Sequence, residues 1–260
     1  DSRVAAVLTA ITNHTDTIGD DLVSADWPGF LERALQQALG TQVPVLTLIA
    51  PSGNINHFDV TSDQGQTCYA EARRIGEAYA EIILRAMENA EAVPPAALAA
   101  THTTLKLRKR AIPAEALRRA EAILAETPAD DTVGTSEDLA RGAPTVLRWF
   151  AQAAVTFARN EAGTVVDFPV MALRLGADTA LVTLPGEPFT EIGMAIRKAS
   201  PFPRTLVVSN ANGYAGYIVP DDLAAHGGYE PLPVAEGGAD AGSAKDLETA
   251  ALKALRDLAR

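Results

Sequence analysis

The sequence predicts a single α/β domain over residues 1–260, in which mixed β-sheets are flanked by helices. Short apolar runs of strand length alternate along the chain with longer segments whose apolar residues recur at helical spacing. The chain also has 260 residues, of which 47% are hydrophobic, enough to bury a substantial core. That length fits one large domain or two small ones, and we take it as one.

Six segments are predicted to be strands. Residues 4–11 and 43–50 are continuous apolar runs, which suit strands covered on both faces. Residues 101–109 alternate between polar and apolar side chains, as a half-exposed strand does. The remaining strand candidates are residues 165–175, 179–184 and 205–209.

Helical spacing predicts six helices. The first has Asp26 as its N-cap candidate and Pro28 in its first turn, and it ends at Gly40. Pro144 is expected to kink or split one helix, because proline lacks the amide proton that a helix interior needs. The other helices are predicted over residues 70–90, 113–126, 136–162, 189–198 and 244–258. A Gly- and Ala-rich stretch over 235–243 is expected to be a mobile loop.

Charge and cysteine content narrow the possible functions. The formal charge of −11 repels polyanions, so nucleic acid is not an expected partner. The single cysteine, Cys68, can form neither an internal disulfide nor a thiolate metal site of two or more cysteines. Any metal ligands must therefore be histidine, carboxylate or phenolate groups.

The sequence also carries expectations about location. No apolar run approaches the roughly 20 residues of a membrane-spanning helix, so a soluble chain is expected. The chain begins at Asp1 and runs almost at once into the strand predicted over 4–11, which suggests that an upstream segment is missing. The lack of disulfides favours the cytoplasm, while secretion stays open if a leader was lost upstream.

Polar segments follow four of the predicted strands at their carboxyl ends. They contain Asn13-His14, Gly53-Asn54, Pro185-Gly186-Glu187 and Asn210-Ala211-Asn212. In open α/β sheets ligands bind beyond such ends. If the strands are parallel, a histidine, a glutamate and several amides share one rim.

These segments resemble the neutral ceramidase family. That family has a histidine segment soon followed by a Leu-Val-Ser-x-Asp-like stretch, a Leu-Pro-Gly-Glu turn, and an Asn-x-Tyr-x-x-Tyr stretch leading to a Tyr-Glu pair. The corresponding segments here, in the same order, are Asn13-His14-Thr15, Leu22-Val23-Ser24-Ala25-Asp26, Leu184-Pro185-Gly186-Glu187, Asn212-Gly213-Tyr214-Ala215-Gly216-Tyr217 and Gly228-Tyr229-Glu230. The resemblance spans nearly the whole chain.

The resemblance implies a zinc-dependent amide hydrolase with a ceramidase-like α/β fold. His14, Glu187 and Tyr217 take three of the family's four places around Zn²⁺. A bound zinc ion activates water for attack on an amide carbonyl. Tyr229 and Asn56 are then expected to act on the carbonyl oxygen. Asn54, His57 and Tyr214 are the expected substrate-binding residues, and the substrate is a small-molecule or lipid-like N-acyl compound.

Two departures from the family bear on activity. The family's other zinc-binding histidine lies in an amino-terminal region that this chain does not contain, so an upstream segment supplies it, His57 substitutes, or the site is incomplete. Asn56 stands where ceramide-cleaving members have a serine, and an amide cannot serve as a nucleophile in the usual way. Water attack is therefore expected, and ceramide itself is a doubtful substrate.

Other interpretations stay open. The candidate residues have ordinary structural roles: a hydrogen-bonded surface histidine, a carboxylate at a helix N-terminus, and half-buried tyrosines. An inactive relative that binds a small ligand or a partner subunit would show the same departures. A third possibility is one part of an assembled enzyme, completed by an upstream segment or a homo-oligomer.

Overall fold

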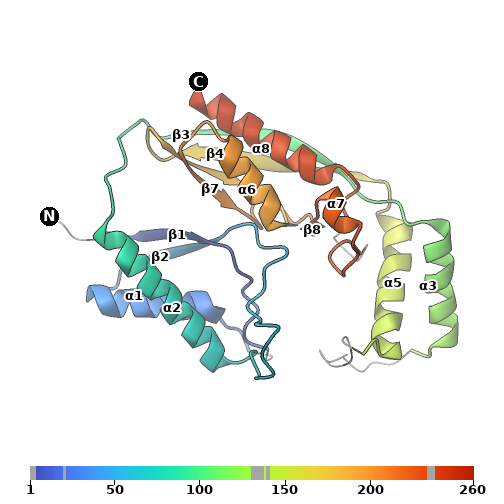
Figure 1. Ribbon diagram of the computed structural model, residues 1–260. Coiled ribbons are helices and arrows are strands. Elements are labelled where there is room, and N and C mark those ends of the chain that lie inside the picture. Colours follow the sequence, from blue (N-terminus) through green and yellow to red (C-terminus); the bar gives the residue numbers. More distant parts are fainter. Residues whose placement is uncertain (1–3, 20–21, 130–137, 139–140, 233–237) are drawn as a thin grey trace.

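A mixed four-stranded sheet forms the centre of the molecule (Figure 1). The computed structural model describes residues 4–19, 22–129, 138, 141–232 and 238–260. The sheet has the order β3-β4-β5-β7, with strands β3 (Ala99–Arg108), β4 (Val165–Arg174), β5 (Thr179–Thr183) and β7 (Arg204–Val208). β3 pairs with β4 and β4 with β5 in antiparallel fashion, whereas β5 and β7 are parallel. This confirms the predicted α/β class with mixed sheets.

Helices α6 (Thr190–Ala199) and α8 (Ser243–Ala259) cover one face of this sheet (Figure 1). Alternation along the strands decides which side chains meet them, because successive residues of a strand point to opposite faces. The inward residues of β3 and β4 are Leu105, Leu107, Phe168 and Val170. They join the apolar faces of both helices in the largest core cluster.

A second layer is built on strands β1 (Val7–Ile11) and β2 (Val45–Ile49), which pair in parallel. Helices α1 (Asp26–Leu39) and α2 (Tyr69–Glu88) pack against each other and against these strands. Their buried side chains form a separate core cluster that includes Trp27, Leu31, Leu35 and Ile75. The apolar spacing predicted both helices, and Gly40 ends the first in a left-handed conformation.

The second face of these strands is exposed over their amino-terminal halves, so the prediction of two covered faces was wrong there. Leu8 and Leu46 are partners in the strand register, and they are 45% and 52% exposed. The alternation of the strands explains the difference, since Val7 points toward the helices and its neighbour points away. A paired patch of leucine therefore lies on the surface.

Helices α3 (Ala114–Glu126) and α5 (Pro144–Asn160) form a hairpin that stands apart from both sheets (Figure 1). A small cluster of Ala120, Ala151 and Val155 holds it together. Pro144 is the first residue of α5, so of the two expected outcomes a helix boundary, and not a kink, lies at this proline. Residues 136, 137, 139 and 140 of the expected helix, and 235–237 of the expected loop, lie outside the described residues.

The carboxyl ends of the parallel strands meet at one rim, as predicted. The amide of Ser209, after β7, donates to the carbonyl of Ile49 at the end of β2, at 2.8 Å. The amide of Gly53 donates to the carbonyl of Pro188 at 3.0 Å, which joins the segments that follow β2 and β5. These bonds confirm that polar segments far apart in the sequence lie together.

Three short elements at this rim were not predicted from the sequence. They are β6 (Glu187–Pro188), β8 (Tyr217–Ile218) and α7 (Asp221–Ala224). The two strands pair in parallel, with Glu187 opposite Tyr217. Two-residue strands have no periodicity of their own, so no sequence pattern could reveal them.

Candidate metal centre

His14 is held at the rim by bonds on both its backbone and its ring. Its carbonyl accepts a hydrogen bond of 2.7 Å from the indole Nε1 of Trp27, which is fully buried. Its ring Nδ1 lies 2.7 Å from the carbonyl oxygen of Ile55. Because a carbonyl oxygen can only accept, Nδ1 must carry the proton of this bond. The other ring nitrogen, Nε2, then faces Glu187 at 3.1 Å from its Oε2.

Glu187 is placed by two glycines that allow backbone segments to approach closely. Gly186 has φ +66, and a Cβ there would lie 2.4 Å from the carbonyl oxygen of Gly216. A Cβ at Gly53 would lie 2.5 Å from the carbonyl oxygen of Glu187 itself. Only glycine avoids both contacts, so these residues fix where the carboxylate leaves the backbone.

The two tyrosines of the Asn-x-Tyr-x-x-Tyr stretch reach the carboxylate by different routes. Tyr214 donates its hydroxyl proton to Glu187 Oε1 at 2.7 Å, so each carboxylate oxygen has its own partner. Tyr217 is the strand partner of Glu187, and its ring stacks with that of His14 at a centroid distance of 6.5 Å. The hydroxyls of Tyr217 and Tyr229 are 2.6 Å apart. The structure thus brings together an imidazole, a carboxylate and a phenol.

The close contacts among these side chains shift the pKa values of His14, Glu187 and Tyr217. The hydrogen bond to Glu187 raises the pKa of His14 against the effect of burial. Burial acts to raise the pKa of Glu187, but the bonds from His14 and Tyr214 outweigh it and lower that pKa. Burial, the bond with Tyr229 and the charge of Glu187 together raise the pKa of Tyr217. A divalent cation would oppose that last shift, because it favours the phenolate.

The donor atoms fit a zinc ion. With its Nδ1 proton committed to Ile55, His14 presents Nε2 to a carboxylate oxygen, which requires either a second proton or a shared cation between the two atoms. A ligand histidine whose other nitrogen donates to a backbone carbonyl is the usual arrangement at zinc sites. In the described part of the chain, no three His, Cys, Asp or Glu side chains converge as a metal site. A zinc site of three protein donors built on His14 and Glu187 would therefore use Tyr217 as the third.

Asn56 and His57 form a polar cluster with Asp16 beside this centre. The Nδ2 of Asn56 donates to Asp16 Oδ2 at 3.1 Å. The ring of His57 is buried, with Nδ1 at 3.2 Å from Asp16 Oδ1 and Nε2 at 3.0 Å from the carbonyl oxygen of Gln66. Both of its nitrogens are thus engaged away from His14. The sequence did not single out Asp16, although it lies only two residues after His14.

Asn54 is not brought to the centre. Its Nδ2 donates to the carboxylate of Glu191 at 2.9 Å, and its Oδ1 accepts from the amide of Thr190. These contacts place Asn54 at the N-terminus of α6, where asparagine commonly satisfies free amides. The substrate-binding role of Asn54 stays a prediction.

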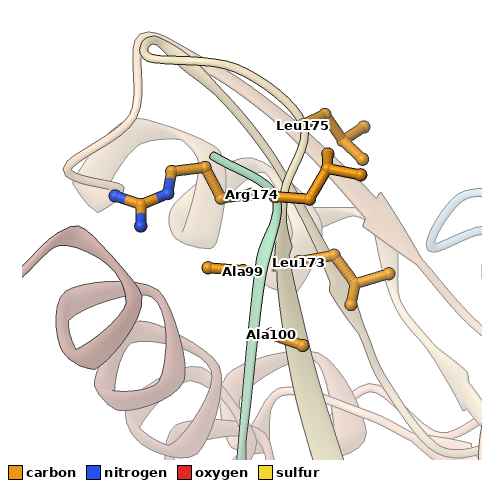
Figure 2. Close-up of a pocket in the computed structure, with 6 residues that line it drawn as sticks. Ala99, Ala100, Leu173, Arg174 and Leu175 are labelled. Carbon is orange, nitrogen blue, oxygen red and sulfur yellow. The ribbon is translucent and has the colours of Figure 1, made fainter. Parts of the chain in front are cut away.

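A separate pocket of about 310 Å³ lies at the other end of the main sheet (Figure 2). It is formed where β3 begins and β4 ends, near Ala99, Leu173 and Leu175. Figure 2 shows Arg174 pointing away from the two leucines, as strand alternation requires. Since Arg174 pairs with Ala180 early in β5, this pocket lies at the opposite end of that strand from Glu187.

Comparison with known proteins gives structural matches only. No family model matches the chain, and no curated protein matches it. The neutral ceramidase of Pseudomonas aeruginosa superposes with a TM-score of 0.60 and 15% identity over 96% of this chain and 44% of that one. A ceramidase complexed with C2 superposes with a TM-score of 0.62 and 15% identity, over 98% and 46%. The chain spans less than half the length of these structures, and it has a neutral ceramidase-like fold.

Proposed function

We propose that the chain carries the zinc centre of a hydrolase that cleaves an amide bond of an N-acyl compound. The convergence of His14, Glu187 and Tyr217 on one point supports the proposal above all. These side chains offer nitrogen, carboxylate oxygen and phenol oxygen, which zinc accepts in protein sites. Bound zinc would supply Lewis acidity toward the amide carbonyl and toward water.

The chain's own residues have distinct roles in this proposal. Tyr214 holds the Glu187 carboxylate by its bond to Oε1 and leaves Oε2 on the side of His14. Tyr229, bonded to Tyr217, and Asn56 supply donors for the oxygen of the substrate carbonyl. Asn56 has no nucleophilic atom, so water is the group that attacks.

The substrate class rests on the fold and on the charge of the chain. The structural neighbours are ceramidases, which supports an N-acyl substrate, small or lipid-like. No described helix is long and apolar enough to cross a membrane. The net charge of −11 argues against a nucleic acid substrate.

Metal analysis of the purified protein tests the proposal, together with hydrolysis of a panel of fluorogenic N-acyl amides. We expect about one zinc ion per chain and an activity that chelation abolishes. Glu187→Gln should lose the zinc ion and the activity. Glu121→Gln, which changes an exposed glutamate on α3, should keep the zinc ion and the activity. A protein without zinc affinity, or a hydrolysis rate that chelation leaves intact, would favour a catalytically inactive relative instead.

A further inference from the structure

The Asp16 carboxylate is the bridge of the cluster beside the candidate metal centre. One of its oxygens accepts from Asn56, and the other faces the buried ring of His57. Its side chain is 46% exposed, so it is open to solvent on one side. The roles proposed above use Asn56 but give nothing to Asp16.

The bonds of this cluster leave one chemically sound orientation for the Asn56 amide. Its Oδ1 accepts from the backbone amide of His57 at 2.7 Å, and its Nδ2 donates to Asp16. A flipped amide would set Nδ2 against the amide proton of His57 and Oδ1 against a carboxylate, two repulsive contacts. The orientation therefore follows from the partners and does not depend on telling nitrogen from oxygen.

This orientation decides what Asn56 can offer to a substrate. The Oδ1 already accepts one hydrogen bond, from the amide of His57, and one of the two Nδ2 protons is used by Asp16. The second Nδ2 proton is the remaining donor of the side chain. Asn56 is thus prepared to donate to an oxygen, and a carboxylate that polarises the amide strengthens that donor.

Asp16 also lies beside the centre in the chain and in space. It follows His14 by two residues, and its Oδ2 accepts from Asn56 at 3.1 Å. One carboxylate is therefore close both to a candidate metal ligand and to a candidate carbonyl donor. This location supports a role toward the reacting groups, which a distant turn residue would not have.

We propose that Asp16 is a positioning residue that fixes the Asn56 carboxamide as a hydrogen-bond donor toward the substrate carbonyl. The inference rests on the proposed amide hydrolysis, because the role of Asn56 belongs to it. It gives a physical reason why asparagine can occupy a place that holds serine in the resembled family: the side chain acts as a donor and not as a nucleophile.

The test compares Asp16→Ala and Asp16→Ser, which cannot reach Asn56, with Asp16→Asn, whose Oδ1 can still accept from it. The matched control is Glu77→Gln, which removes one negative charge from an exposed position of α2. The side-chain amide signals of Asn56 are followed by ¹⁵N NMR and assigned with Asn56→Asp, and kcat, KM and zinc affinity are measured on the same proteins.

In Asp16→Ala and Asp16→Ser we expect the Asn56 amide signals to move and kcat to fall roughly 10-fold to 100-fold, with KM and zinc affinity unchanged. Asp16→Asn should restore most of kcat, and the control should match the wild type. Unmoved Asn56 signals, or a loss of zinc affinity that parallels the loss of kcat, would overturn the assignment. If the wild type hydrolyses no amide, the proposed function fails, and the NMR signals alone decide whether Asp16 orients Asn56.

Discussion

The backbone at Gly186 shows how much the site depends on one small residue. Its φ of +66 disfavours any side chain, and the carbonyl oxygen of Gly216 occupies the place of a Cβ. Gly163 has a similar φ of +76, but a Cβ there would meet no atom within 4 Å. Substitution of Gly163 therefore measures only the cost of placing a side chain on this backbone conformation. We expect Gly163→Ala to cost about 1 kcal/mol of unfolding free energy and Gly186→Ala about 3 kcal/mol. Urea unfolding of both variants measures the difference, and equal costs would contradict the close contact.

The hydroxyl of Tyr214 has a role that a simple truncation can test. It donates to Glu187 Oε1, and outer partners of this kind typically contribute about 10-fold to 100-fold to metal affinity. Tyr214→Phe should therefore weaken zinc binding by about that factor, while thermal stability stays near that of the wild type. Tyr69→Phe removes a hydroxyl from an exposed tyrosine of α2 and should leave zinc affinity unchanged. Isothermal titration calorimetry with zinc compares the two.

At the level of single residues, the sequence predicted which three side chains meet but not the bonds that hold them. His14, Glu187 and Tyr217 were expected from the family resemblance, and the structure brings them together. The bonds from Trp27 and Asp16 were not expected, because each depends on how segments fold back on one another. A residue type alone does not show which partner it will meet.

Among the elements, helices α1 and α2 are in unusually close contact at Gly76. A Cβ on this residue would lie 2.6 Å from the carbonyl oxygen of Trp27 and 2.7 Å from the amide of Leu31. Gly76→Ala must push the helices apart, and we expect it to cost about 2 kcal/mol despite the better helix propensity of alanine. Glu77→Ala, at the exposed neighbouring position, should cost little. Thermal unfolding of both variants measures the difference, and equal stabilities would contradict the close contact.

The Gly76→Ala substitution should also change the position of His14, because Trp27 of helix α1 is bonded to it. The indole of this residue donates to the carbonyl of His14, so a shift of α1 moves the imidazole. We expect Gly76→Ala to weaken zinc binding, although position 76 contacts none of the three ligands. A variant that is destabilised but binds zinc as the wild type does would show that α1 does not position His14.

Helix and strand positions were largely predictable, because each element carries a periodic apolar pattern. Helix α2, expected over 70–90, spans Tyr69–Glu88, and β4, expected over 165–175, spans Val165–Arg174. Pro144 was expected to kink or split a helix, and α5 begins at this residue. The rigid ring and the missing amide proton suit the first turn of a helix.

For the whole molecule, the three separate core clusters among the described residues predict uneven stability. The largest lies between the main sheet and its helices, whereas the α3–α5 hairpin has only a small cluster of its own. Segments with few buried apolar contacts open at lower free energy than the core. Hydrogen exchange should therefore proceed faster in α3 and α5 than in β4 and α8. Equal protection of the two regions would show that the molecule unfolds as one unit.

Strand order could not be read from the sequence. β3 and β4 are antiparallel, as are β4 and β5, while β5 and β7 are parallel. Pairing direction is set by the connections and by the helices that cover the sheet, which are properties of the complete fold. The predicted shared rim was correct because β1, β2, β5 and β7 form parallel pairs.

The contact between the hydroxyls of Tyr217 and Tyr229 allows zinc binding to be followed by ultraviolet absorption. If Tyr217 holds the proposed zinc ion, its hydroxyl would lose its proton, and Tyr229 would then be the donor of their bond. Phenolate absorbs ultraviolet light at longer wavelength than phenol, and the chain has only five tyrosines. Zinc titration should therefore produce a difference spectrum, which Tyr217→Phe would abolish.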